Sequence, residues 1–120
     1  MKKIFLLFVS VFMICIISGC SITEEEILIT SQSSPDNNYT IFLYQVGTPQ
    51  WSFGSVSAKL VLKDFKGKKI DEENFGLAND GGPVTDNNIV EIIWLDDKVE
   101  IEMKEFDTTQ QYTYILNYSN

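Results

Sequence analysis

The chain of 120 residues contains no histidine and no arginine, and it has only two cysteines and three prolines. Without histidine there is no Ser-His-Asp or Cys-His nucleophile, no histidine-bound metal and no histidine acting as general base near neutral pH. No serine stands three positions before a lysine, and there is no glycine-rich phosphate-binding loop. The usual sequence signatures of hydrolases, metalloenzymes and nucleotide-binding enzymes are therefore missing.

Carboxylates are the remaining candidates for acid–base catalysis. Asp96 and Asp97 are adjacent in a predicted turn, and Glu100 and Glu102 lie on the exposed side of a predicted strand. A catalytic carboxyl pair needs burial that drives the two pKa values apart, and neither setting supplies it. We expect a protein that is not an enzyme and that needs no cofactor and no metal. A carboxylate-based hydrolase is the enzymatic alternative.

The longest hydrophobic run lies at the N-terminus, directly after Lys2 and Lys3. Residues 4–17 are apolar except for Ser10. As a helix rising about 1.5 Å per residue, this run spans roughly 21 Å, which is short for a hydrocarbon core of about 30 Å. A basic start, a short apolar run and small residues after it are typical of an export signal. Residues 1–19 are thus predicted to be a helical signal peptide that is removed.

The signal ends in Ile17-Ser18-Gly19-Cys20, which resembles the lipobox of bacterial lipoproteins. The resemblance implies that a diacylglycerol is attached to the Cys20 sulfur and that a peptidase cuts between Gly19 and Cys20. Residues 20–26 would then be a lipidated cysteine and a short tether on the extracytoplasmic face of the cell membrane. An ordinary signal peptide and an uncleaved anchor are the alternatives.

The part that remains after cleavage is strongly acidic. Lys2 and Lys3 leave with the signal, so seven lysines face 17 aspartates and glutamates, a net charge of −10. Such a domain is repelled by nucleic acid and by anionic headgroups. Its acidity either serves solubility or attracts a basic protein partner. Because Cys15 is removed and Cys20 is consumed by the lipid, no disulfide can form, and the hydrophobic core alone must stabilise the fold.

Short β-branched and aromatic runs separated by turn residues predict a single all-β domain over residues 27–120. Residues 56–63 alternate between apolar and polar side chains except at Val61, as expected for a half-exposed strand, and Phe65 is expected to close its end. We predict a small antiparallel sandwich or strongly curved sheet of about six to seven strands. The recognisable strands are 27–30, 39–46, 56–63, 89–95, 99–105 and 111–118.

Two short motifs resemble a known group of proteins. Ser34-Pro-Asp-Asn-Asn-Tyr39 and Trp94-Leu-Asp-Asp-Lys-Val-Glu-Ile101 are similar to a Ser-Pro-Asp turn and a Trp-x-Asp-Asp hairpin in small uncharacterised Gram-positive lipoproteins. The same turn opens strands in propeller repeats, but one occurrence does not make a propeller. The resemblance implies a place in the cell envelope and no particular activity.

Residues 71–88 form the longest segment without a clear hydrophobic period. A helical turn is expected near residues 71–75, and the rest is predicted to be a solvated turn. Its oxygen-bearing side chains suggest calcium, but their spacing fits no loop with a defined ligand register. The sequence leaves open whether this loop binds an ion.

Aromatic residues supply the candidate binding sites. Trp51 and Phe53, on a Gly/Pro-rich loop, form either a binding platform or a cap on the core. Tyr112 and Tyr114, on one face of the last strand, either bind a sugar or partner strand or are half-buried sheet surface. We expect an envelope lipoprotein that binds a protein or envelope component, and an immunity-like or scavenging role is one concrete version of this function. The alternative is an accessory subunit of a membrane complex that docks through Trp51 and Phe53.

Overall fold

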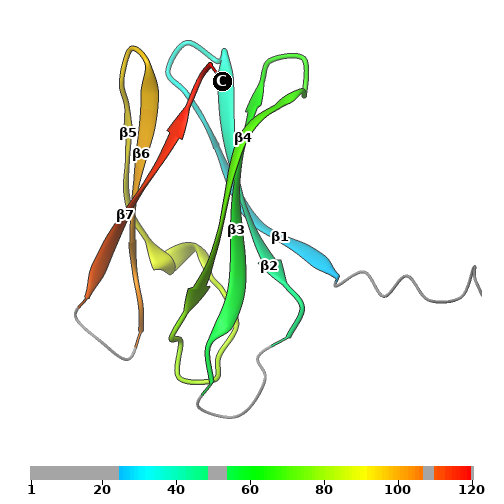
Figure 1. Cartoon of the computed structure of the whole chain (residues 1–120), viewed down its shortest axis with the longest axis vertical. Coiled ribbons are helices and arrows are strands. Elements are labelled where there is room, and N and C mark those ends of the chain that lie inside the picture. The colour runs from blue at the N-terminus through cyan, green and yellow to red at the C-terminus, as the bar shows by residue number, and fades with distance from the viewer. Residues whose placement is uncertain (1–24, 49–53, 107–109, 120) are drawn as a thin grey trace, which may run out of the picture.

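The computed structural model describes residues 25–48, 54–106 and 110–119, which fold into seven antiparallel strands and one short 3-10 turn. The strands form two sheets, one in the order β1-β2-β3-β4 and one in the order β5-β6-β7 (Figure 1). The elements are β1 (Glu26–Ser33), β2 (Tyr39–Val46), β3 (Val56–Asp64), β4 (Lys69–Leu77), η1 (Asp86–Asn88), β5 (Ile89–Trp94), β6 (Lys98–Lys104) and β7 (Gln111–Asn117). The predicted all-β antiparallel sandwich is confirmed.

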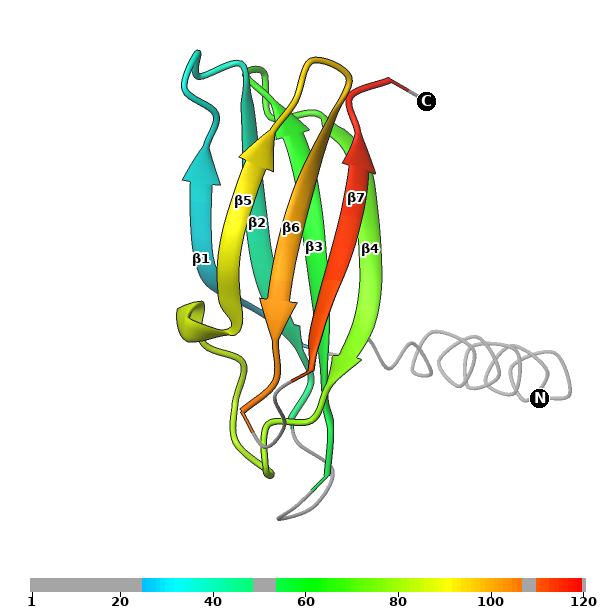
Figure 2. The ribbon, with the colours of Figure 1, turned by 90° about the vertical axis from the view of Figure 1, so that its left-hand side faces the viewer.

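The two sheets lie face to face, with β5, β6 and β7 covering one face of the larger sheet (Figure 2). Within each sheet every strand pairs with its neighbour in the sequence, so the chain makes two successive meanders. β2 and β3 pair without a register shift from Tyr39↔Asp64 to Val46↔Ser57. Because side chains alternate between the faces of a strand, this register sends the apolar positions of both strands to the same side.

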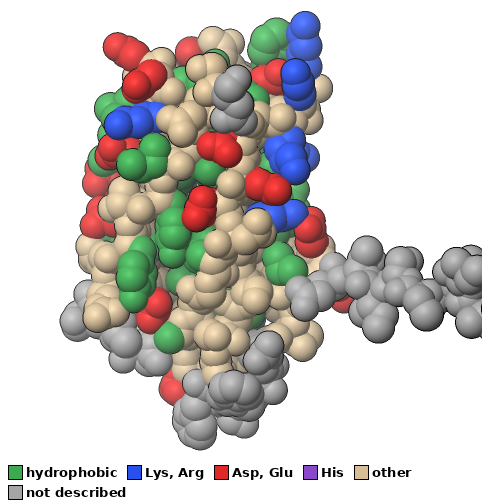
Figure 3. Space-filling view, in the orientation of Figure 1, with side chains coloured by type: hydrophobic (Ala, Val, Ile, Leu, Met, Phe, Trp, Pro, Cys, Tyr) green, Lys and Arg blue, Asp and Glu red, His purple; other side chains and the backbone are tan. Residues whose placement is uncertain are grey.

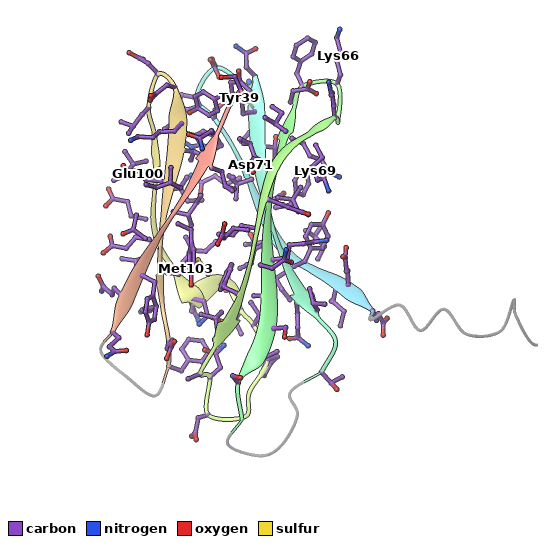
Figure 4. All side chains as sticks on the ribbon, in the orientation of Figure 1. Tyr39, Lys66, Lys69, Asp71, Glu100 and Met103 are labelled. Carbon is purple, nitrogen blue, oxygen red and sulfur yellow. The ribbon has the colours of Figure 1, made fainter. Side chains whose placement is uncertain are left out.

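The core fills the space between the sheets. Figure 4 shows Met103 pointing from β6 toward the first sheet, whereas Glu100 points away from it. The buried hydrophobic cluster draws on both sheets and on the loop after β4, and it consists of Ile41, Leu43, Val56, Ala58, Leu60, Leu62, Leu77, Val84, Val99, Ile101, Met103 and Leu116. Because both sheets contribute to this core, its burial holds them face to face.

The prediction of a helical turn near residues 71–75 is wrong, because β4 covers that segment and pairs with β3. β4 is an edge strand, so it pairs on one side only and can carry polar residues that a central strand would exclude. Its only apolar side chains near the core are Ile70, Phe75 and Leu77. The alternation of apolar and polar residues in β4 is therefore too weak to predict a strand from the sequence.

Two contacts join β4 to β7 across the gap between the sheets. The rings of Phe75 and Tyr114 stack with centroids 4.3 Å apart. The backbone N–H of Asn117 donates to Asp71 Oδ2 at 3.0 Å. The Asp71 side chain therefore satisfies a donor on the free edge of β7 and links the two sheets.

The loop between β4 and β5 is not a simple solvated turn, which corrects the sequence prediction. Val84, Asn79 and Asn88 are buried in it. The Asn79 and Asn88 side-chain amides donate to each other's Oδ1 at 3.0 Å in both directions. We call the end of the sandwich formed by residues 78–88 the asparagine end.

Further hydrogen bonds attach this asparagine pair to its surroundings. Asn88 Nδ2 donates to the Lys104 carbonyl at 2.8 Å, and the Thr85 N–H donates to Asn88 Oδ1 at 3.0 Å. Asn79 Nδ2 donates to the Pro83 carbonyl at 3.1 Å. A buried polar group is tolerated when its hydrogen bonds are made, and this network makes those of both amides.

The predicted signal helix, residues 1–19, lies outside the described residues. Over residues 25–48, 54–106 and 110–119, no helix has the length and hydrophobicity needed to cross a membrane.

Candidate functional site

Four residues singled out in the sequence, Gly19, Cys20, Trp51 and Phe53, lie outside the described residues. The loop that contains Trp51 connects β2 to β3. β2 finishes and β3 starts at the asparagine end of the sandwich. The Gly47 N–H donates to the Glu25 carbonyl at 2.8 Å, so the end of β2 lies beside the start of β1.

Tyr112 and Tyr114 do not form one exposed surface. The face that they share turns toward the first sheet, where Tyr114 packs on Phe75, and burial raises the pKa of Tyr114 above its ordinary value. Tyr112 is 40 % exposed, and its hydroxyl donates to Gln110 Oε1 at 2.7 Å. The structure therefore separates the two side chains into a packing residue and a surface residue.

The last tyrosine on the same face, Tyr118, takes part in a different arrangement. Its ring stacks on that of Tyr39, with centroids 4.3 Å apart and planes inclined by 8°. The Tyr118 N–H donates to the Asp97 carbonyl at 3.3 Å, and burial raises the pKa of its hydroxyl. We call this end of the sandwich, formed by the turns 34–38, 64–68 and 95–97 with Tyr118, the tyrosine end.

The turn 34–38 is held by the carboxylate of Asp36. Ser34 Oγ donates to Asp36 Oδ1 at 2.5 Å, and the Asn38 backbone N–H donates to the same oxygen at 3.1 Å. Asn38 Nδ2 donates to Asp36 Oδ2 at 3.0 Å. Asn37 takes a φ of 62°, a left-handed conformation that asparagine tolerates better than most residues. The turn therefore presents Asn38 and Tyr39 in fixed positions.

These hydrogen bonds predict a pH effect on stability. The bond from Ser34 is the main reason that the pKa of Asp36 is lowered from 3.8, followed by the bond from the Asn38 backbone. A lowered folded-state pKa stabilises the fold above the unfolded pKa, and this contribution disappears as the pH falls through the folded pKa. Asp36→Asn is expected to be less stable than wild type at pH about 5, with the difference shrinking toward pH about 2. Urea unfolding across this range measures it, and a difference that does not change with pH would contradict the assignment.

The turn 64–68 is equally well fixed. Asp64 Oδ1 accepts the backbone N–H groups of Lys66 and Lys68, each at 2.9 Å. Gly67 has a φ of 81°, which favours glycine, and its N–H donates to the Asp64 carbonyl at 3.0 Å. Phe65 does not close the end of β3 as expected, because the turn holds its side chain outward and 71 % exposed.

Two hollows flank the tyrosine stack. The first has a volume of about 610 Å³ and lies between the stack and the turn 64–68, with Asn38, Lys69 and Ile70 also in its wall. The second has a volume of about 430 Å³ and lies between the stack and the turns 34–38 and 95–97. Trp94 lines the second hollow, and its Nε1 is buried with no hydrogen-bond partner among the described residues.

Charge is unevenly distributed over the two sheets. Residues 56–77 carry five lysines and four carboxylates, whereas residues 89–118 carry two lysines and seven carboxylates. Figure 3 shows lysine side chains gathered on the side of the first sheet, at the upper right, and Figure 4 places Lys66 and Lys69 there. Lys68 and Lys69 line the first hollow, and Asp36 and Asp96 line the second. The first hollow therefore carries two lysines beside the carboxylate of Asp64, whereas the charged side chains of the second hollow are all carboxylates.

The chain has no match among protein-family models, curated proteins or solved structures. Within the described residues there is no group of three or more acidic or cysteine side chains that could hold a metal ion. In the loop considered for calcium, the amides of Asn79 and Asn88 bind each other. The tyrosine end is thus the candidate site on geometric grounds. The sequence analysis did not predict a site at the tyrosine end. The sequence feature that points to it is the position of Tyr39 directly after the turn residues 35–38.

Proposed function

We propose that the protein is a lipid-anchored lipoprotein on the extracytoplasmic face of the cell membrane. Its domain binds an envelope component or a protein at the tyrosine end and carries out no catalysis. The lipobox-like Ile17-Ser18-Gly19-Cys20 supports the anchor. The pair of preformed hollows around the Tyr39–Tyr118 stack is the observation that carries the binding role.

The placement of β1 supports this choice of surface. β1 begins at Glu26, six residues after Cys20, so a fully extended tether would reach roughly 20 Å. β1 then runs for eight residues toward the tyrosine end, about 26 Å at 3.3 Å per residue (Figure 1). The hollows lie at the end of β1 farther from the lipid, where a large partner can approach.

The rigidity of the site also favours binding. Both turns beside the first hollow are fixed by hydrogen bonds to a carboxylate, Asp36 in one and Asp64 in the other. A preorganised surface loses little conformational freedom when a ligand binds. An exposed phenylalanine such as Phe65 contributes apolar surface at the site and none to the core.

Site-directed photo-crosslinking on intact cells tests this proposal. A photoreactive side chain at Phe65 is expected to capture a cell-envelope component, because that position is 71 % exposed beside the first hollow. Tyr112 is the matched control, since it is also exposed and lies near the opposite end of the domain. Capture from Tyr112 and not from Phe65 would contradict the proposal. Capture from Trp51 alone would favour the accessory-subunit alternative.

A further inference from the structure

We infer that the first hollow binds an acidic saccharide, that is, a sugar that carries a carboxylate or phosphate group. This inference rests on the proposed binding role of the tyrosine end and names the ligand class. It follows from three properties of the wall of the hollow: its unpaired cation, its aromatic rings and its free hydrogen-bond acceptors.

The cations come from β4 and the turn before it. Lys68 and Lys69 line the hollow. Lys69 Nζ lies 3.3 Å from Glu72 Oε2, whereas Lys68 has no ion-pair partner in the described part of the chain. In a domain of strongly negative net charge, an ammonium group without a carboxylate partner is available to an anion. The carboxylate or phosphate of the ligand would pair with it.

The rings provide the surface for the body of the ligand. Phe65 borders the hollow on one side, and the stacked Tyr39 and Tyr118 border it on the other. Sugar rings have one or more faces of C–H groups, which pack on aromatic rings while their hydroxyl groups stay free for hydrogen bonds. Exposed aromatic residues with polar ends are suited to such amphipathic ligands.

The acceptors distinguish a saccharide from an aromatic acid. Asp64 uses Oδ1 for the turn, and no described residue donates to its Oδ2. Asn38 donates through Nδ2 to Asp36, and its Oδ1 accepts from no described residue. Hydroxyl groups of a sugar can donate to both oxygens. An aromatic carboxylate has no hydroxyl groups to donate. Its negative charge would therefore lie near that of Asp64 with no hydrogen bond to the Asp64 carboxylate.

The size of the hollow agrees with this ligand class. Its volume of about 610 Å³ falls within the usual range for small-molecule sites, roughly 300–1,000 Å³. The second hollow is lined by Asp36 and Asp96 and by no lysine, so it does not attract an anion.

The test is a titration of the processed, lipidated protein in neutral detergent micelles, followed through its amide resonances. Glucuronate is expected to shift, in a saturable way, resonances of Asn38, Tyr39 and residues 64–70. Glucose, which lacks the charge, and benzoate, which lacks the hydroxyl groups, are expected to bind at least about tenfold more weakly. Equal binding of glucose or benzoate, or no shift with glucuronate, would overturn the inference.

A pair of matched double variants locates the cations. Lys68→Gln with Lys69→Gln is expected to weaken glucuronate binding roughly tenfold, because the ligand loses its charged partners. Lys98→Gln with Lys104→Gln changes the net charge by the same amount on the second sheet and is expected to leave affinity within about twofold. If both variants lose affinity equally, only the overall charge matters and the site is wrong. Phe65→Ala, on an exposed side chain, is expected to weaken binding without affecting the fold.

Two further results separate this inference from the proposed function. Capture of a protein from Phe65 in cells, together with no glucuronate binding, would uphold the binding role and exclude an acidic saccharide. Saturable glucuronate binding supports the inference whether or not a protein is captured. Tighter binding of a galacturonate trimer than of the monomer would identify a polymer as the source, and equal binding would identify a free sugar.

Discussion

Replacing Cys20 by serine is expected to leave an unlipidated precursor that keeps residues 1–19. Serine has no thiol, so no thioether to a diacylglycerol can form. Two acyl chains contribute about 0.8 kcal/mol for each buried methylene group, which is enough to anchor a lipoprotein stably on the membrane. Labelling cells with a fatty-acid probe, fractionating them and weighing the N-terminal peptide by mass spectrometry measure this effect.

Cys15→Ser is the matched control for this experiment. Cys15 lies within the apolar run 4–17 of the predicted signal, so its loss is expected to leave lipidation and processing unchanged. A Cys20→Ser chain that is processed and labelled like wild type would contradict the lipoprotein assignment. Residue 20 found unmodified in the wild-type protein would do the same.

Replacing Asn88 by alanine is expected to lower the free energy of unfolding by about 3 to 5 kcal/mol. The Asn88 side chain is fully buried and makes hydrogen bonds to Asn79, to Thr85 and to the Lys104 carbonyl. Alanine would remove both bonds of the buried Asn79 amide to this side chain, and it would leave the partly buried Thr85 N–H and Lys104 carbonyl without this partner. Each buried group that loses its partner costs about 1 to 3 kcal/mol. Thermal unfolding should show a fall in Tm of at least about 12 °C for a domain of this size.

Asn87→Ala is the control for that variant, because Asn87 lies in the same 3-10 turn and is exposed. It is expected to change stability by no more than about 0.5 kcal/mol. Asn79→Ala combined with Asn88→Ala should cost less than the sum of the single variants, since both remove the same pair of bonds. Equal Tm values for Asn87→Ala and Asn88→Ala would show that the buried pair does not hold the asparagine end together.

Much of the sheet structure could be predicted from local patterns. β2 begins and ends where the sequence predicted, because Pro35 and the asparagines before it and Gly47 after it mark its ends. β3 follows from its alternation, which only Val61 interrupts, since a strand that places one face in the core must repeat apolar residues with period two. These signals depend only on neighbours in the chain.

β4 could not be predicted in this way. Three acidic residues, Asp71, Glu72 and Glu73, interrupt its pattern, and they are tolerated only because β4 is at the edge of its sheet. Whether a strand lies at an edge depends on how all the strands are ordered, which local patterns do not contain. The asparagine pair was missed for a related reason, because its partners come together only when the second sheet covers the first.

The sequence alone determined the fold class, the lack of histidine chemistry and the acidic charge, and from its first twenty residues it predicts export and lipidation. These properties belong to composition and to short-range periodicity. Only the tertiary structure decided which tyrosines meet and where hollows form. Tyr39 and Tyr118 come from different sheets at opposite ends of the domain's sequence, and they stack because the sandwich brings the start of β2 beside the end of β7. A binding site of this kind depends on the packing of distant segments, which no local pattern encodes.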